Sequence, residues 1–264
     1  MQEPDVKDIW GFCVIFAAMF GLFSKKNNRT PMDYTLVKTD MHSHLLPGID
    51  DGSPDLETSV TLIRHFKELG FTKVITTPHI LWDLYKNTPA IIQNKLELVR
   101  NALKENQIDI EIAAAAEYFL DDHVSDLLKK KEKLLTIGKD LVLTEFSTMH
   151  KSMSMKEILF DVQMAGYQPV LAHPERYIYL YKNWDFFHEI KDNGVLFQLN
   201  LLSLTGGYGN RVREIAQYLL DNDFYTLVGT DLHHEGHMNR LQSLEVPAKL
   251  QDLLTSNRLL NKTL

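Results

Sequence analysis

Short hydrophobic runs alternate with amphipathic stretches from residue 33 onward. The runs predict seven strands, near residues 36, 73, 110, 141, 169, 195 and 226. The stretches between them repeat apolar residues at the spacing of a helix face, and they predict helices over residues 53–70, 88–103, 124–133, 155–165, 184–193 and 212–222. Strands and helices that alternate in this way form parallel sheets with right-handed crossovers. The pattern therefore predicts an α/β fold whose strands close into a TIM-barrel-like ring.

The first two predicted helices carry recognisable end signals. Ser53 is expected to cap the first, with Pro54 at its first position, and Gly70 is expected to end it. Thr88 and Pro89 are expected to start the second helix in the same manner.

Six of the hydrophobic runs end at a side chain that can bind a metal ion. His42 and His44 follow the run from Tyr34 to Met41, and they point the same way if that segment is a strand. The other runs close on His79, Glu117, Glu145, His173 and Asp231, and further candidates, Asp50, Asp51 and His233, lie in the loops. Each residue alone could be a helix cap or a loop hydrogen-bonding group. Because the carboxyl ends of barrel strands meet on one face, the repetition predicts a metal site there.

Net charge and cysteine content exclude several kinds of binding site and catalytic nucleophile. The formal net charge of −7 over 264 residues argues against a nucleic-acid-binding surface, and the basic run Lys129–Lys131 with Lys133 is interpreted as a solvated helix face. The single cysteine, Cys13, excludes an internal disulfide and a cysteine-ligated zinc site. It also excludes a cysteine phosphatase nucleophile, since Cys13 lies far outside the pattern of strand ends.

The first 32 residues are expected to form an apolar and basic arm ahead of one catalytic domain, residues 33–264. The apolar stretch Ile9–Phe23 is shorter than the roughly 20 residues that span a bilayer, and it lacks a positive segment before it. If it did insert, Lys25, Lys26 and Arg29 after it would keep the domain in the cytoplasm. We therefore expect a cytoplasmic protein whose membrane contact, if any, is made by the arm. Whether translation starts at Met1 or Met19 is open.

The motifs resemble, in order, those of the PHP superfamily. They are His42-Ser43-His44, Asp50-Asp51-Gly52, Thr77-Pro78-His79, Glu117, Glu145-Phe146, Ala172 to Tyr177 and Thr230-Asp231-Leu232-His233. More narrowly, Leu46 to Gly52 and His173 to Tyr177 resemble the bacterial PHP-type protein-tyrosine phosphatases associated with capsular and extracellular polysaccharide synthesis. The resemblance covers residues 40–237, and it implies a distorted (β/α)7 barrel.

The resemblance also implies a cluster of three metal ions, expected to be Mn²⁺. One ion would be held by His42, His44, Glu117 and Asp231; a second by Glu117, Glu145 and His173; and a third by Asp51, His79 and His233. Spacing alone cannot separate Asp51 from Asp50. Ligand softness does not choose among the metals either, so Fe²⁺ and Zn²⁺ also suit this nitrogen and oxygen set.

The implied reaction is hydrolysis of phosphotyrosine by metal-activated hydroxide, without a covalent phosphoenzyme. Arg176 is expected to bind a phosphate oxygen, the alternative being a salt bridge with Glu175. His237 is a candidate proton donor to the leaving group. Related phosphatases carry an arginine shortly after the last Asp-x-His motif, where Gly236 stands in this chain, and Arg240 is a candidate substitute.

Features around the expected mouth of the site are compatible with a phenyl ring. Four aromatic residues could flank the ring or could equally be packing residues: Tyr118, Phe119, Tyr177 and Tyr208. The segment Gly206–Gly209 is interpreted as a flexible loop over that mouth, and it lacks the lysine of a P-loop.

The expected partner is a phosphotyrosine protein, a bacterial tyrosine kinase of the polysaccharide export machinery. A small-molecule phosphatase, such as one acting on histidinol phosphate, would present nearly the same ligands and stays open. Two further alternatives are a PHP module of a DNA polymerase and a non-catalytic metal scaffold. The acidic free-standing chain argues against the former, and the complete ligand set argues against the latter.

Overall fold

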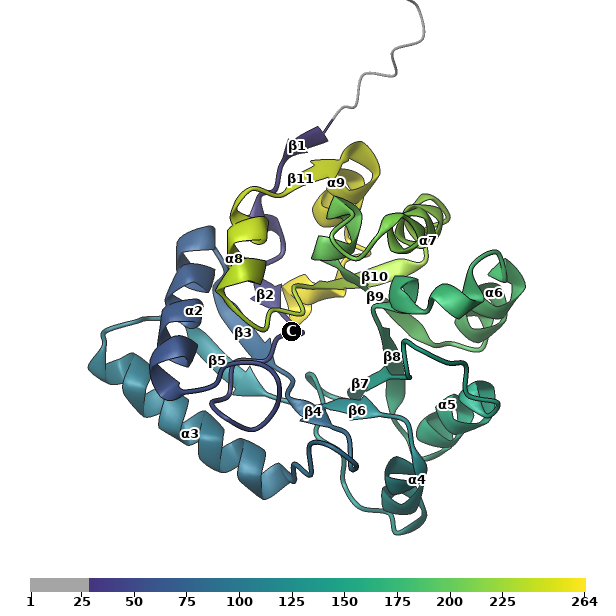
Figure 1. Ribbon diagram of the computed structural model, residues 1–264, viewed down its shortest axis with the longest axis horizontal. Coiled ribbons are helices and arrows are strands. Elements are labelled where there is room, and N and C mark those ends of the chain that lie inside the picture. The colour runs from purple at the N-terminus through teal and green to yellow at the C-terminus, as the bar shows by residue number, and fades with distance from the viewer. Residues whose placement is uncertain (1–28) are drawn as a thin grey trace, which may run out of the picture.

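The computed structural model describes residues 29–264, so the predictions for Ile9–Phe23 and Met19 lie outside the described residues. Its strands form a ring enclosed by helices (Figure 1). In order around the ring they are β2 (Thr39–Asp40), β3 (Lys73–Thr76) continued by β4 (His79–Ile80), β5 (Glu111–Ala114) continued by β6 (Glu117–Phe119), β7 (Leu141–Glu145), β8 (Gln168–Ala172), β9 (Leu196–Asn200) and β10 (Tyr225–Gly229). Every ladder between neighbours in this ring is parallel. The predicted seven-stranded α/β barrel is confirmed, with two of its strands broken.

The first predicted strand is mostly wrong. Tyr34–Leu36 form a 3-10 helix, and only Thr39–Asp40 pair as β2. The Asp33 carboxylate accepts hydrogen bonds from the backbone N–H and the hydroxyl of Thr35, which starts a turn where the apolar pattern indicated extended chain.

The helices lie outside the ring (Figure 1). They are α2 (Leu56–Leu69), α3 (Pro89–Glu105), α4 (Asp122–Lys129), α5 (Met155–Met164), α6 (Trp184–Asp192), α7 (Asn210–Asp221), α8 (Glu235–Gln242) and α9 (Ala248–Thr255). Thr88 caps α3, as predicted, and Gly70 ends α2 in a left-handed conformation with φ of 102°. The predicted cap Ser53 is wrong, because the Asp55 carboxylate accepts from the Thr58 N–H instead.

Two apolar cores pack on the two faces of the ring. Leu260 and Leu264 of the carboxyl-terminal segment pack against the small interior core. This core consists of Met41, Ile75, Ala115, Ile137, Leu143, Val170, Ala172 and Leu227. The larger core lies between the strands and the helices. Because the interior is packed at one end, open space is left at the other end, where the strands finish.

The ring closes between β10 and β2 through single hydrogen bonds and side chains. Near the carboxyl ends, the Asp231 N–H donates to the His42 carbonyl at 2.8 Å and the His44 N–H donates to the Leu232 carbonyl at 2.9 Å. Near the other end, the buried Asn261 amide donates to the carbonyls of Thr39 and Val228 and accepts from the Val228 N–H, at 2.7–2.9 Å. The Asn261 side chain therefore replaces backbone hydrogen bonds that a direct β2–β10 ladder would make at this end.

A short antiparallel pair lies beside the barrel. β1 (Arg29–Pro31) pairs with β11 (Glu245–Pro247), so the last residues of the predicted arm pair with a strand near the carboxyl end of the chain. Among the described residues, none of the helices combines the length and the apolar character that crossing a bilayer requires.

We predict that Asn261→Ala lowers the free energy of unfolding by about 2–4 kcal/mol, because it leaves buried backbone groups on both strands without partners. Denaturant unfolding followed by circular dichroism measures the change. Thr263→Ala, at an exposed position two residues away, is the matched control. Equal unfolding midpoints for the two variants would show that closure of the ring between β10 and β2 does not depend on Asn261.

Candidate metal centre

Strand register brings the predicted ligands together. His79 and Glu117 are direct partners in the β4–β6 ladder. Glu117 and Glu145 each lie two residues beyond a side chain of the interior core, Ala115 and Leu143, so the alternation of a strand turns both carboxylates inward as well. The ends of the strands thus carry charge on the same face that is apolar deeper in the barrel.

Two ligand candidates reach the centre through left-handed backbone. His173 has φ of 33° and Asp231 has φ of 50°, a region that non-glycine residues seldom occupy. Ala172 faces the interior core, so an unbroken strand would turn His173 outward. The left-handed turn redirects its ring to the centre, which is the kind of local strain that functional sites retain.

The Glu117 carboxylate lies at the middle of the cluster and is fully buried. Its Oε2 atom is 3.2 Å from His42 Nε2, 3.4 Å from His44 Nε2 and 3.2 Å from His79 Nδ1. Its Oε1 atom is 3.1 Å from His173 Nε2. None of the three contacts to Oε2 has the geometry of a hydrogen bond. A buried carboxylate oxygen that is surrounded by imidazole nitrogens but accepts no hydrogen bond is a candidate metal ligand.

Hydrogen bonds at Nδ1 of His42 and His44 determine that Nε2 of each ring points toward the centre. His42 Nδ1 is 3.0 Å from the Gln198 side-chain oxygen, and His44 Nδ1 is 2.9 Å from the Asp50 carboxylate. Both acceptors require N–H at Nδ1, so each neutral ring directs its Nε2 lone pair inward. The two Nε2 atoms lie 3.4 Å apart, and Asp231 Oδ1 is 3.3 Å from one and 3.5 Å from the other. These donors suit a cation between them.

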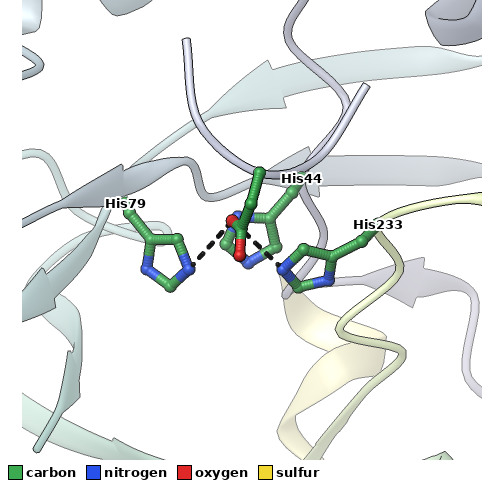
Figure 2. A group of neighbouring side chains, drawn as sticks. His44, His79 and His233 are labelled. Atoms are coloured by element: carbon green, nitrogen blue, oxygen red, sulfur yellow. Dashed lines mark ion pairs between the residues drawn. The ribbon is translucent and has the colours of Figure 1, made fainter. Parts of the chain in front are cut away.

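A second group of ligand atoms lies at the open side. Figure 2 shows His79 and His233 on either side of the carboxylate that joins them. That carboxylate is Asp51, whose Oδ1 atom is 3.5 Å from the Nε2 atoms of both rings. His233 Nδ1 donates to the Asp231 carbonyl at 2.8 Å, which leaves its Nε2 lone pair free to bind a cation. His44 stacks on His233 with ring centroids 4.0 Å apart.

The side chains of the neighbouring residues Asp50 and Asp51 lie in different surroundings. Asp50 is turned inward, where its carboxylate accepts from His44 Nδ1 and from the backbone N–H groups of Gly52 and His79. The Asp51 side chain is half exposed and lines the cavity. Asp51 is therefore the one whose carboxylate is available to an ion, and Asp50 holds a histidine in place.

Two glycines make room for the histidines. A Cβ atom on Gly229 would lie 2.7 Å from His42 Cβ, and one on Gly52 would lie 2.2 Å from the His44 carbonyl oxygen. Larger residues at either position would push a ligand ring away from the centre.

Charge balance in the cluster shifts several pKa values. Burial alone would lower the pKa of His79, but the carboxylates of Glu145 and Glu117 outweigh burial and raise it to about 9. Burial opposes ionisation of Glu117, yet His42 and His79 hold its pKa well below the usual range. The imidazoles and carboxylates of the cluster therefore stabilise each other's charged forms.

A cavity of about 590 Å³ opens over the cluster, lined by the ligand candidates Asp51, His79, Glu145, His173, Asp231 and His233. Arg176 and His237 also line it. Arg240 lines a different cavity, together with Arg29 and Gly207. The structure thus brings two of the three predicted phosphate-handling residues to the centre and places the third beside it.

Arg176 pairs with Asp231, not with Glu175. Its Nη1 atom is 2.9 Å from Asp231 Oδ2, and its guanidinium carbon lies 5.1 Å from the centre of the Tyr208 ring. Glu175 is buried and accepts from the Asn200 N–H and the Tyr225 hydroxyl. The alternative of a rim salt bridge with Glu175 is wrong.

The four predicted aromatics divide into two pairs. Phe119 and Tyr208 line the cavity. Tyr118 and Tyr177 are buried in the outer core, where their hydroxyls bond backbone groups of Leu135, Phe146 and Ala172.

Sequence reasoning missed two polar residues of strand β9. Gln198 accepts from His42 Nδ1 and from the His173 N–H, and the Asn200 amide donates to Asp231 Oδ2 at 2.9 Å. The sequence signal that could have identified them is an amide side chain at two alternate positions of an otherwise apolar strand. Both residues orient predicted ligands.

Comparison with known proteins gives a consistent family assignment. The family model described as "Capsular polysaccharide synthesis, CpsB/CapC" matches residues 38–248. Tyrosine-protein phosphatase YwqE of Bacillus subtilis is 28% identical over 195 residues, which cover 74% of this chain and 77% of that protein. Tyrosine-protein phosphatase CpsB of Streptococcus pneumoniae is 28% identical over 200 residues, covering 74% and 82%.

Solved structures agree in fold. One such chain comes from the crystal structures of YwqE from B. subtilis and CpsB from S. pneumoniae, described as "unique metal-dependent tyrosine phosphatases". It superposes with a TM-score of 0.73 at 26% identity, covering 83% of this chain and 89% of that one. The lactonase Lmo2620 from Listeria monocytogenes superposes with a TM-score of 0.50 at 13% identity, covering 80% and 84%. The latter likeness concerns the fold alone.

We predict that divalent metal binding releases protons and weakens as the pH falls from 8.5 to 6. The raised pKa of His79, about 9, and those of His42 and His44, also raised, mean that metal must displace protons from the imidazoles. Calorimetric titration of chelator-treated protein with Mn²⁺, in two buffers of different ionisation enthalpy, counts the protons. Binding without proton release, at pH-independent affinity, would show that the imidazoles are not ligands.

Proposed function

Because the chain belongs to the CpsB/CapC family of capsular polysaccharide synthesis, we propose that it is a metal-dependent protein-tyrosine phosphatase. The observation that carries this proposal is the convergence of imidazole nitrogens on the buried Glu117 carboxylate. Two of the histidines that contact it, His79 and His173, line a cavity together with Arg176. The names of the relatives as tyrosine phosphatases support the substrate class. They favour it over a small phosphate ester such as histidinol phosphate.

Three cation positions account for the donor atoms. His42, His44, Glu117 and Asp231 would hold the first ion, and Glu117, Glu145 and His173 the second. Asp51, His79 and His233 would hold the third. His79 faces both of the latter groups, because its Nδ1 atom is 3.0 Å from Glu145 and its Nε2 atom 3.5 Å from Asp51. The nitrogen and oxygen set suits Mn²⁺, our proposed cofactor, as well as Fe²⁺ or Zn²⁺.

Bound cations would polarise the phosphate ester and lower the pKa of a water molecule so that it can attack phosphorus. Arg176 would hold a phosphate oxygen through its planar fork. Its bond to Asp231 and its place beside Tyr208 orient the guanidinium before substrate arrives. Only Nη1 is bound to Asp231, so the rest of the fork is available to an anion.

His237 fits a hydrogen-bonding role better than that of a charged acid. Burial, and next the neighbouring His234 and His233, lower its pKa to about 4, so its ring is neutral at pH 7. Its Nδ1 atom accepts from the His233 N–H at 3.4 Å, which leaves Nε2–H to donate. His237 would thus donate a hydrogen bond toward the leaving oxygen. Arg240, in the adjoining cavity, would act on substrate beyond the reacting phosphate.

The proposed physiological substrate is a phosphorylated tyrosine kinase of the polysaccharide export machinery. Such a kinase is phosphorylated from ATP inside the cell, so the phosphatase would act in the cytoplasm, at or near the inner face of the membrane. The family assignment to capsular polysaccharide synthesis supports this partner.

We predict that Mn²⁺ restores phosphatase activity to chelator-treated protein, with higher kcat/KM on a tyrosine-phosphorylated peptide than on histidinol phosphate. His42→Ala should lose bound metal and at least about a hundredfold in kcat/KM, because it removes a ligand from the centre. Metal content by mass spectrometry and phosphate release measure both effects. His188→Ala, an exposed histidine on α6 outside the cavity, is the control.

Three outcomes would count against this proposal. A preference for histidinol phosphate would move the enzyme to small-molecule metabolism with the same metal centre. Full metal content in His42→Ala would refute the ligand assignment. No turnover of either substrate by the metal-loaded protein would favour a non-catalytic scaffold.

We predict that Arg176→Ala raises KM for aryl phosphates by about tenfold or more, because a charge-assisted bond to phosphate is lost. Bound metal should be retained, since Asp231 keeps its Asn200 partner. Steady-state kinetics with p-nitrophenyl phosphate and metal analysis separate the two effects. Arg211→Ala, an exposed arginine against Tyr181, is the matched control. Loss of metal from Arg176→Ala would instead assign Arg176 a structural role.

A further inference from the structure

Exposed apolar side chains border the mouth of the metal cavity. Leu84, in the loop between β4 and α3, is 72% exposed, and Met149, in the loop between β7 and α5, is 84% exposed. Both side chains line the same cavity as the proposed metal ligands. Met153 continues the second loop and is 95% exposed. Exposed apolar surface at the mouth of a polar site indicates that a ligand or another protein binds there.

The loops that carry these side chains have defined backbones. In the first, the Leu81 carbonyl accepts from the N–H groups of Leu84 and Tyr85 at 3.0 and 2.7 Å, and the Tyr85 ring stacks on His79. In the second, the Ser147 hydroxyl accepts from the N–H groups of Met149 and His150, and its carbonyl accepts from Tyr179. Local hydrogen bonds therefore hold both loops in conformations that leave the apolar tips in solvent.

A protein substrate must place two parts of itself at different depths. Its phosphate has to reach the ligands on the floor of the cavity, and its phenyl ring then passes the lining aromatics Phe119 and Tyr208. The residues on either side of the phosphotyrosine are left at the mouth, against Leu84 and Met149. A small aryl phosphate has no such residues and makes no contact there.

We propose that Leu84 and Met149 form a docking lip that selects polypeptides with apolar residues next to the phosphotyrosine. The proposal rests on the phosphatase function proposed above and extends it to substrate sequence. Apolar contact at the lip removes both partners from water, and the unbranched side chain of Met149 adapts to different partner shapes. The lip thus binds the chain that carries the phosphotyrosine, while the metal centre and Arg176 bind the phosphate.

The test compares two tyrosine-phosphorylated peptides that differ only in the residues flanking the phosphotyrosine, leucine in one and serine in the other. With Mn²⁺-loaded protein, kcat/KM for the leucine peptide should exceed that for the serine peptide by about tenfold, the size of selectivity that one apolar contact supports. The double variant Leu84→Ser, Met149→Ser should lose most of this ratio. p-Nitrophenyl phosphate reports turnover that does not involve the lip.

The matched control removes apolar surface elsewhere. Phe160→Ser with Met164→Ser changes two residues on α5 that are 58% and 70% exposed and do not line the cavity, and this variant should keep the ratio. Equal kcat/KM for the two peptides on the unaltered protein, or an equal loss of the ratio in both double variants, would overturn the lip. Failure to hydrolyse any aryl phosphate would instead refute the phosphatase on which it rests.

Discussion

The buried carboxylate of Glu117 is the constraint on which the rest of the site depends. A carboxylate without water must be compensated by positive charge, and here four imidazole nitrogens lie within 3.4 Å of its two oxygens. The same arrangement can be balanced by protons or by metal ions. Metal ions held by the same groups would supply this positive charge. The ligand atoms are thus organised around one buried carboxylate.

That organisation comes from the strands and from residues behind the ligands. The β4–β6 ladder puts His79 opposite Glu117, and left-handed backbone at His173 and Asp231 directs these two ligand candidates inward. Gln198 and Asp50 fix the outer nitrogens of His42 and His44. The proposed substrate contacts, Leu84 and Met149, lie instead on loops, which can vary without disturbing the barrel. Most of the proposed metal ligands therefore lie at or just beyond strand ends, whereas Asp51, His233 and the proposed substrate contacts lie in loops.

The sequence was informative wherever a residue's role followed from its distance to the end of a strand. Strand alternation turns Glu117 and Glu145 inward, so their place at the centre could be predicted from position alone. Asp50 and Asp51 could not be separated in this way, because tertiary partners decide which of the two turns inward. Ser53 failed as a helix cap for a similar reason: its N–H is bound to the His44 carbonyl, and Asp55 caps α2 instead. Arg240 resembled a phosphate ligand by sequence distance, but α8 carries it to the neighbouring cavity.

Asp231 connects the two functions of the cavity. Its Oδ1 atom faces His42 and His44, and its Oδ2 atom accepts from Arg176 and Asn200. A cation on the Oδ1 side would draw the carboxylate inward, and an anion on the remaining N–H groups of Arg176 would share the guanidinium charge with Oδ2. Binding of phosphate would then loosen the bond between Arg176 and Asp231 and leave more negative charge on Asp231 for the metal. Metal and phosphate should therefore strengthen each other's binding, since the coupling free energy between two sites acts in both directions.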